Sequence, residues 1–263
     1  MPLAVWVNVL WVLEMTGKAA LIVRLWSLGL DRTYRWFSWF LRYTLAVAIV
    51  EFFVRTGSTL YARIWFYSKP VEWTLGLLAV MELYALVMAR YPGIATAGRW
   101  LVRATLPLAI LVSVATLKLD FSNPLEKFPL LRLEMATHRT VVMAMALCVM
   151  LLLWFLLRFP IPLGRNVILH CSLYATYLSA EALGVLARNL LGTSASKPAY
   201  IGGAIVGIFC LCMWTLRMNR AGESTIAVAV PRRDAASDQA LLKKLERLNA
   251  VLIGTSEGEV VKG

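Results

Sequence analysis

The residues that could do chemistry in this sequence are ionisable side chains that interrupt long apolar stretches. They are Glu14, Lys18, Glu51, Glu82, Glu134, His138, Arg139, His170 and Glu181. A charged side chain at the centre of a bilayer costs about 2.5–3.5 kcal/mol on insertion scales, so we expect each of them to face other helices or water rather than lipid. Such residues are typical of ion paths, proton relays, ligand contacts and interhelical hydrogen bonds.

Glu14 and Lys18 are four residues apart in the first apolar stretch. On a helix this spacing places them on one face, where they can form an ion pair. The pair is interpreted first as a self-neutralising device that lets the helix enter a membrane. The functional alternative is a gate or a step in an ion path.

Other ionisable residues indicate a candidate ligand site. Glu134 and His138 are four residues apart, and His170 and Glu181 are 11 apart, which is almost three helical turns and places them on nearly one face. We hypothesise an outward-facing polar pocket between the second, third, fifth and sixth membrane helices. Its residues would be Glu51, Glu72, Glu134, His138, His170 and Glu181. The alternative is a set of separate interhelical hydrogen bonds and interface charges.

The sequence lacks the patterns expected of catalytic and cofactor sites. Two histidines are too few for a three-histidine zinc centre, and no phosphate-binding loop or nucleophile elbow is present. Haem ligation by His138 and His170 is the one cofactor alternative. The four cysteines lie in apolar stretches and are interpreted as packing residues. We therefore predict no enzyme, no catalytic residue, no metal and no cofactor.

The elements that must position these residues are membrane-spanning helices. The chain has 263 residues, of which 60% are hydrophobic, and its mean hydropathy is +0.69. The apolar residues form blocks of about 20, the length of a helix that crosses a bilayer, without the alternation of a β-barrel strand. The fold class predicted is all-α, a polytopic bundle of seven transmembrane helices. The predicted spans are 3–28, 34–54, 71–90, 100–117, 135–159, 167–191 and 199–218, and the segments 55–69 and 192–197 are predicted as connections.

The residues after the bundle (domain 1–220) are predicted to form a cytoplasmic tail, 221–263. Residues 221–234 are interpreted as a flexible linker and 238–252 as a short amphipathic helix. Its leucines, Leu241, Leu245, Leu248 and Leu252, are spaced four, three and four, which produces one apolar stripe. A helix of this length is marginal in water by itself. We therefore expect it to meet a second copy of the chain, a cytoplasmic partner or the membrane surface.

The formal charge of +12 is interpreted as a topology signal and not as a nucleic-acid surface, because the basic residues gather at the edges of the apolar blocks. There they can also contact anionic headgroups of the lipid bilayer. More of them fall on the cytoplasmic side when the N-terminus is outside. The predicted orientation is therefore N-terminus outside and C-terminus inside, with no nucleic-acid partner.

Short motifs over residues 9–218 carry a resemblance to a known family. They are Tyr34-Arg35-Trp36-Phe37, Phe53-Val54-Arg55-Thr56-Gly57, Glu82-Leu83-Tyr84, Arg132-Leu133-Glu134 through Arg139, and Ser179-Ala180-Glu181. With these motifs the chain resembles an uncharacterised family of bacterial seven-helix membrane proteins common in acidobacteria. The resemblance implies a seven-helix protein of the inner membrane. It implies no activity, substrate or catalytic residue.

Two functions follow as hypotheses, and a membrane-embedded enzyme, for which no catalytic constellation can be named, is the third and least favoured. The first is a non-enzymatic sensory or scaffolding module, with a ligand in the outward pocket and the tail helix as its cytoplasmic contact. The alternative is a transporter or channel for a small solute or ion, which the intramembrane carboxylates, the Glu14–Lys18 pair and the kink predicted at Pro107 favour. No internal repeat, which many transporter folds contain, is visible in the sequence.

Overall fold

The computed structural model describes residues 3–54, 58–89, 129–159, 161–191, 193–224, 226–227 and 235–260. Within these ranges the chain forms eight helices and two very short strands. The long helices are α1 (Leu3–Leu28), α2 (Arg35–Phe53), α3 (Thr59–Met88), α5 (Pro129–Arg158), α6 (Arg165–Leu191), α7 (Thr193–Arg217) and α9 (Ala235–Val260), and the short elements are α8 (Ala221–Ser224), β1 (Leu163–Gly164) and β2 (Ile226–Ala227). The predicted span 100–117 lies outside the described residues.

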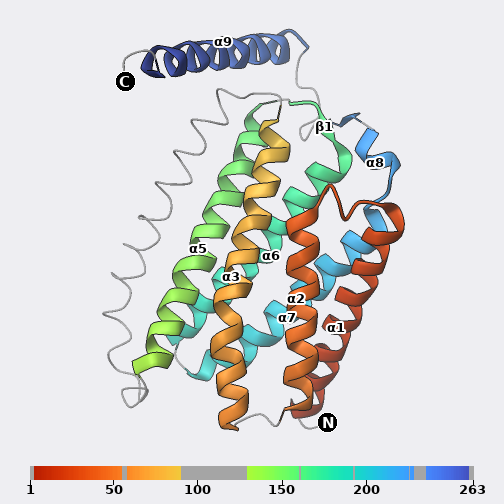
Figure 1. Ribbon diagram of the computed structural model, residues 1–263, viewed down its shortest axis with the longest axis vertical. Coiled ribbons are helices and arrows are strands. Elements are labelled where there is room, and N and C mark those ends of the chain that lie inside the picture. Colours follow the sequence, from red (N-terminus) through yellow and green to blue (C-terminus); the bar gives the residue numbers. More distant parts are fainter. Residues whose placement is uncertain are drawn as a thin grey trace.

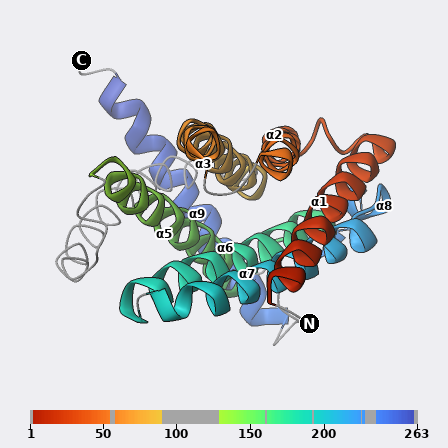
Figure 2. The same ribbon diagram turned by 90° about the horizontal axis from the view of Figure 1, so that it is seen from below.

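Six helices, α1 to α3 and α5 to α7, run side by side as a bundle, and α9 lies across one end of it (Figure 1). We call this end the tail face. It holds the last residues of α1, α3, α5 and α7 and the first residues of α2 and α6. The opposite end, where α1 begins, is called the N-terminal face. Seen along the bundle, the C-terminal part of α9 extends beyond α3 and α5 (Figure 2).

Five of the described helices, α1, α2, α3, α5 and α7, are long and apolar enough to cross a membrane. This architecture is that of a helical multi-pass membrane protein, as predicted, whereas the number of seven crossings stays a prediction. In the described part, α6 is the long bundle helix that does not meet this measure of apolarity. It packs against α5 and α7 and touches α3, so much of its surface faces protein instead of lipid and tolerates polar side chains.

Polar contacts between helices satisfy the backbone where α1 ends and α2 begins. Gly29, at φ +67°, closes α1 in a Schellman motif, in which Leu30 N–H donates to Leu25 O (2.9 Å) and Gly29 N–H to Trp26 O (3.0 Å). The guanidinium of Arg220 donates to Leu28 O (2.7 Å) beside it. A residue of the short segment between α7 and α8 thus holds the end of the first helix.

The N-terminus of α2 receives its cap from another helix. The residue at its N-cap position, Tyr34, makes no side-chain capping hydrogen bond. The carboxylate of Glu82, on α3, instead accepts from the backbone N–H of Trp36 (3.0 and 3.1 Å) and of Phe37 (3.2 Å). The free N–H groups of a helix start favour a negative charge, so this contact fastens α2 to α3.

The predicted start of the third span was wrong. Residues 59–69, predicted as a connection, are the first turns of α3, which begins after Ser58 and carries Pro70 in its interior. The Ser58 hydroxyl accepts from Tyr61 N–H (3.1 Å), the usual geometry of a helix N-cap. Pro70 therefore lies inside the helix, because the cap at Ser58 decides where the helix begins.

Two further connections differ from the prediction. Thr193–Lys197, predicted as a loop, belongs to α7, so Pro198 also lies inside a helix. The first residues of the predicted flexible linker form α8 and β2, and β2 pairs with β1 through Leu163–Ala227 and Gly164–Ile226. The tail therefore returns to the bundle instead of leaving it, and α9 is longer than the predicted 238–252.

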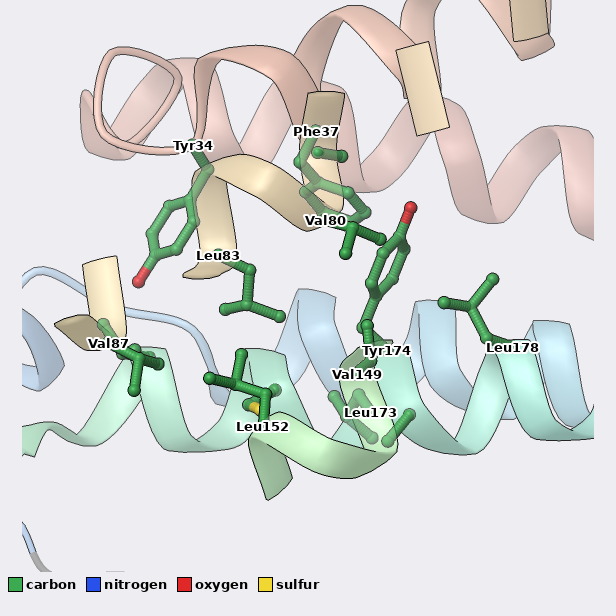
Figure 3. Packing of buried hydrophobic residues seen from close by; sticks show 14 of the residues in the cluster. Tyr34, Phe37, Val80, Leu83, Val87, Val149, Leu152, Leu173, Tyr174 and Leu178 are labelled. Atoms are coloured by element: carbon green, nitrogen blue, oxygen red, sulfur yellow. The ribbon is translucent and has the colours of Figure 1, made fainter. Parts of the chain in front are cut away.

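The core of the bundle is an apolar cluster to which the described bundle helices contribute. Figure 3 shows Val80, Leu83 and Val87 of α3 facing Val149 and Leu152 of α5. On the same cluster lie Leu173, Tyr174 and Leu178 of α6 and, from the start of α2, Tyr34 and Phe37. Leu245 of α9 joins this cluster with 1% of its surface exposed, so the tail helix shares the core of the bundle.

Candidate functional site

A polar cluster between α3, α5 and α6 lies in the half of the bundle nearer the N-terminal face. At its centre is His138 of α5. The Trp73 indole N–H donates to His138 Nδ1 (3.0 Å), and His138 Nε2 lies 3.7 Å from Oε1 of Glu181. Because an indole nitrogen can only donate, Nδ1 must be the unprotonated nitrogen, and the ring proton is on Nε2, facing the Glu181 carboxylate. Trp73 therefore sets the tautomer with which His138 meets Glu181.

An ion pair adjoins this contact. Lys69 Nζ lies 2.8 Å from Oε2 of Glu72, one turn along α3, and 4.3 Å from the centroid of the Trp65 ring. The Lys69 ammonium also interacts electrostatically with Glu51 of α2 and with Glu181. Lys69 thus connects carboxylates from α2, α3 and α6, and we use the name "polar cluster" for Glu51, Lys69, Glu72, Trp73, His138 and Glu181.

Four of the six residues predicted for the ligand site lie in this cluster, namely Glu51, Glu72, His138 and Glu181. Glu134 lies on α5, but its side chain is outside the described part of the chain. Lys69 was missed because residues 55–69 were predicted as a connection. Trp73 lies in the predicted span 71–90 but was missed because the predicted site was built from ionisable side chains only. The three-residue spacing of Lys69 and Glu72 was the signal that could have placed the lysine on a helix.

His170 lies apart from the cluster. Eleven residues separate it from Glu181, which is about 16 Å along α6. The His170 ring is packed among Phe37 (4.4 Å between ring centroids), Tyr34 (5.1 Å), Tyr174 (5.6 Å) and Trp214 (5.6 Å). It belongs to an aromatic group near the tail face and not to the group around Glu181.

The pair predicted on α1 is present. Lys18 Nζ lies 2.8 Å from Oε1 of Glu14, and both side chains are partly buried. The local spacing within one helix is enough to produce this contact. Glu14 also interacts electrostatically with Tyr177 of α6.

A hydrogen-bonded clamp at the tail face joins the tail to the bundle. Oε1 of Glu223 accepts from the Tyr34 hydroxyl (2.8 Å) and from Nδ2 of Asn166 (2.8 Å), which also donates to Asn219 O (2.7 Å). Burial, and then the nearby Glu223 carboxylate, raise the pKa of Tyr34. Tyr34 therefore remains a neutral donor. We call these four residues, Tyr34, Asn166, Asn219 and Glu223, the tail clamp.

One face of α6 connects the polar cluster with the tail clamp. Asn166, His170, Tyr174, Tyr177 and Glu181 are spaced four, four, three and four, so they follow one line along the helix. Tyr174 stacks on His170 (5.6 Å between centroids) and on Tyr177 (6.3 Å), and Tyr177 interacts electrostatically with Glu181. This polar stripe of α6 runs from Asn166, in the tail clamp, to Glu181, which contacts His138 of α5.

The arrangement can hold charge and pass a change of position or of hydrogen bonding along α6. Among the described residues, no group of three His, Cys, Asp or Glu side chains is placed to hold a metal ion. Comparisons with protein-family models, with curated proteins and with solved structures found no match to this chain.

Proposed function

We propose that this chain is a non-enzymatic sensory module of a membrane, in which the polar cluster receives a small charged solute and α6 carries the response to the tail. The observation that carries the proposal is the polar stripe of α6, whose two ends contact His138 and Glu223. A ligand that binds Glu181 in competition with His138 would alter the contact between these two residues. The other end of the same helix is hydrogen-bonded to the tail, so a displacement of α6 would reach α8 and α9.

The proposed setting is the inner membrane of a bacterium, with the N-terminus outside and α9 in the cytoplasm. Seven crossings, with the predicted span 100–117 among them, are part of this proposal. Exposed Arg32, Arg35 and Arg217 lie at or near helix ends of the tail face, which favours that side as cytoplasmic. A cytoplasmic partner or a second copy would meet the leucine stripe of α9 beyond Leu245, where Leu248 is 46% exposed.

Hydrogen–deuterium exchange in lipid bilayers tests the sensory proposal without knowledge of the ligand. Glu181→Gln retains the shape of the side chain but removes the charge that faces His138. We expect faster amide exchange not only around Glu181 but also in residues 219–224, because the clamp is attached to the same helix.

Glu246→Gln, on the exposed face of α9, is the matched control and should change neither region. Faster exchange confined to the N-terminal half of the bundle in Glu181→Gln would refute the coupling through α6.

The second candidate is a transporter or channel for a small ion. The observation that favours it is that partly buried ionisable groups follow one another from α1 to α6, in the pairs Glu14–Lys18, Lys69–Glu72 and His138–Glu181. Ion or proton flux into liposomes that contain the purified chain is the test. Flux above that of empty liposomes, lost in Glu181→Gln, would establish transport. Flux equal to that of empty liposomes would exclude it.

A further inference from the structure

Two buried polar atoms in the aromatic group near the tail face have no hydrogen-bond partner within the described part of the chain. They are Nδ1 of His170, on α6, and Nε1 of Trp214, on α7. His170 is 1% exposed and Trp214 is 2% exposed, so bulk water does not serve these atoms. Buried polar side-chain atoms in proteins are nearly always bonded, either to protein or to an ordered water molecule.

The two rings are direct neighbours in the aromatic group. Their centroids are 5.6 Å apart with 53° between the planes, so they do not stack face to face. Phe37 and Tyr174 pack against both rings, with centroids 4.4 and 5.6 Å from His170 and 5.0 and 6.2 Å from Trp214. The two nitrogens thus lie within a group of packed aromatic rings.

The chemistry of the two nitrogens selects the occupant. An indole N–H is a donor only, whereas Nδ1 of a neutral imidazole is an acceptor when the proton is on Nε2. A molecule between them must therefore accept from one side and donate to the other. Water is the smallest molecule that does both, and buried waters typically occupy such polar sites while apolar cavities stay dry.

We propose that one water molecule binds between α6 and α7, accepting a hydrogen bond from Trp214 Nε1–H and donating one to Nδ1 of His170. This inference goes beyond the proposed function and does not depend on it. The water would join α6 to α7 one helical turn from Asn166. His170 would then be in the Nε2–H tautomer, and its ring meets those of Tyr34 and Phe37 in T-shaped contacts.

The chain is well suited to a direct test because it contains only two histidines. The full chain, labelled with ¹⁵N-histidine and embedded in lipid bilayers, would be studied by solid-state NMR, and His138→Gln assigns the remaining signals to His170. We expect the Nδ1 resonance of an unprotonated, hydrogen-bonded nitrogen, with a cross-peak to water protons. In Trp214→Phe the water loses its donor, so this cross-peak should be lost and the Nδ1 resonance should shift toward that of a free imine nitrogen.

Trp154→Phe, at a position 62% exposed on α5, is the matched control and should leave both signals unchanged. Three results would overturn the proposal: a protonated Nδ1, an Nδ1 signal without contact to water, and a water cross-peak that persists in Trp214→Phe. If Trp214→Phe does not fold, the first two can still be read from the unsubstituted protein.

Discussion

Glu82 shows at the scale of a residue how a carboxylate in an apolar helix can serve the backbone of a neighbour. Its oxygens accept the N–H groups of Trp36 and Phe37, which are free because a helix start has no preceding turn. Replacing Glu82 by Leu leaves these groups without an acceptor. We expect the free energy of unfolding to fall by about 1–2 kcal/mol, as for the loss of a helix cap, and Gln to restore part of it.

Thermal unfolding in detergent, with Glu246→Leu on the exposed face of α9 as the control, measures this effect. The capping role is excluded if Glu82→Leu unfolds at the same temperature as the control variant.

The close packing around Gly222 leads to a second prediction at the scale of a residue. A Cβ at this position would overlap Oδ1 of Asn166, so the tail clamp leaves no room for a side chain. Gly222→Ala should lower the free energy of unfolding by about 1–3 kcal/mol, a typical cost of overpacking. The added substitution Asn166→Ala removes the overlap, and the loss should then be less than the sum of the two single effects.

Gly202→Ala is the control, because a Cβ there meets nothing within 4 Å, and alanine in a helix should be tolerated. Additive losses in the double variant would contradict a direct contact between Gly222 and Asn166.

At the scale of elements, Leu245 is the buried leucine of the α9 stripe among those whose side chains the structure describes. Leu245 is 1% exposed, whereas Leu248 is 46% exposed. The loss of a buried leucine side chain costs about 2–5 kcal/mol, so Leu245→Ala should release α9 from the tail face. Trypsin should then cleave after the exposed Lys243 and Lys244 at least about tenfold faster, since a factor of ten corresponds to about 1.4 kcal/mol.

Leu248→Ala is the matched variant and should leave the rate of cleavage unchanged. Equal rates for Leu245→Ala and Leu248→Ala would mean that α9 does not depend on its contact with the bundle.

At the scale of the whole molecule, the two faces must lie on opposite sides of a membrane. A reporter inserted between Val54 and Ser58 lies at the N-terminal face, and one fused after Gly263 follows α9 at the tail face. We expect the two reporters to be active in opposite compartments, with the C-terminal one in the cytoplasm. A reporter inserted between Leu30 and Arg32 should agree with the C-terminal one, and activity of all three in one compartment would refute the topology.

Local periodicity was sufficient for several features of this protein. The block of apolar residues from Leu3 to Leu28 predicted α1 with the bounds that the structure has. The four-residue spacing of Glu14 and Lys18 predicted their ion pair, because both residues belong to one helix. Features of this kind depend on the length and composition of a single segment, which the sequence contains in full.

Contacts between segments required the tertiary structure. The spacing of His170 and Glu181 placed both on one face of α6, but only the rotation and depth of the neighbouring helices brought His138 to Glu181 and the aromatic rings to His170. The same applies to the Glu82 cap of α2 and to the cover of Leu245. Periodicity determines which side chains share a face of one helix, whereas the partner of that face depends on how separate helices pack. In lipid, many apolar helix faces are equivalent as packing partners, so the sequence of one helix does not select among them.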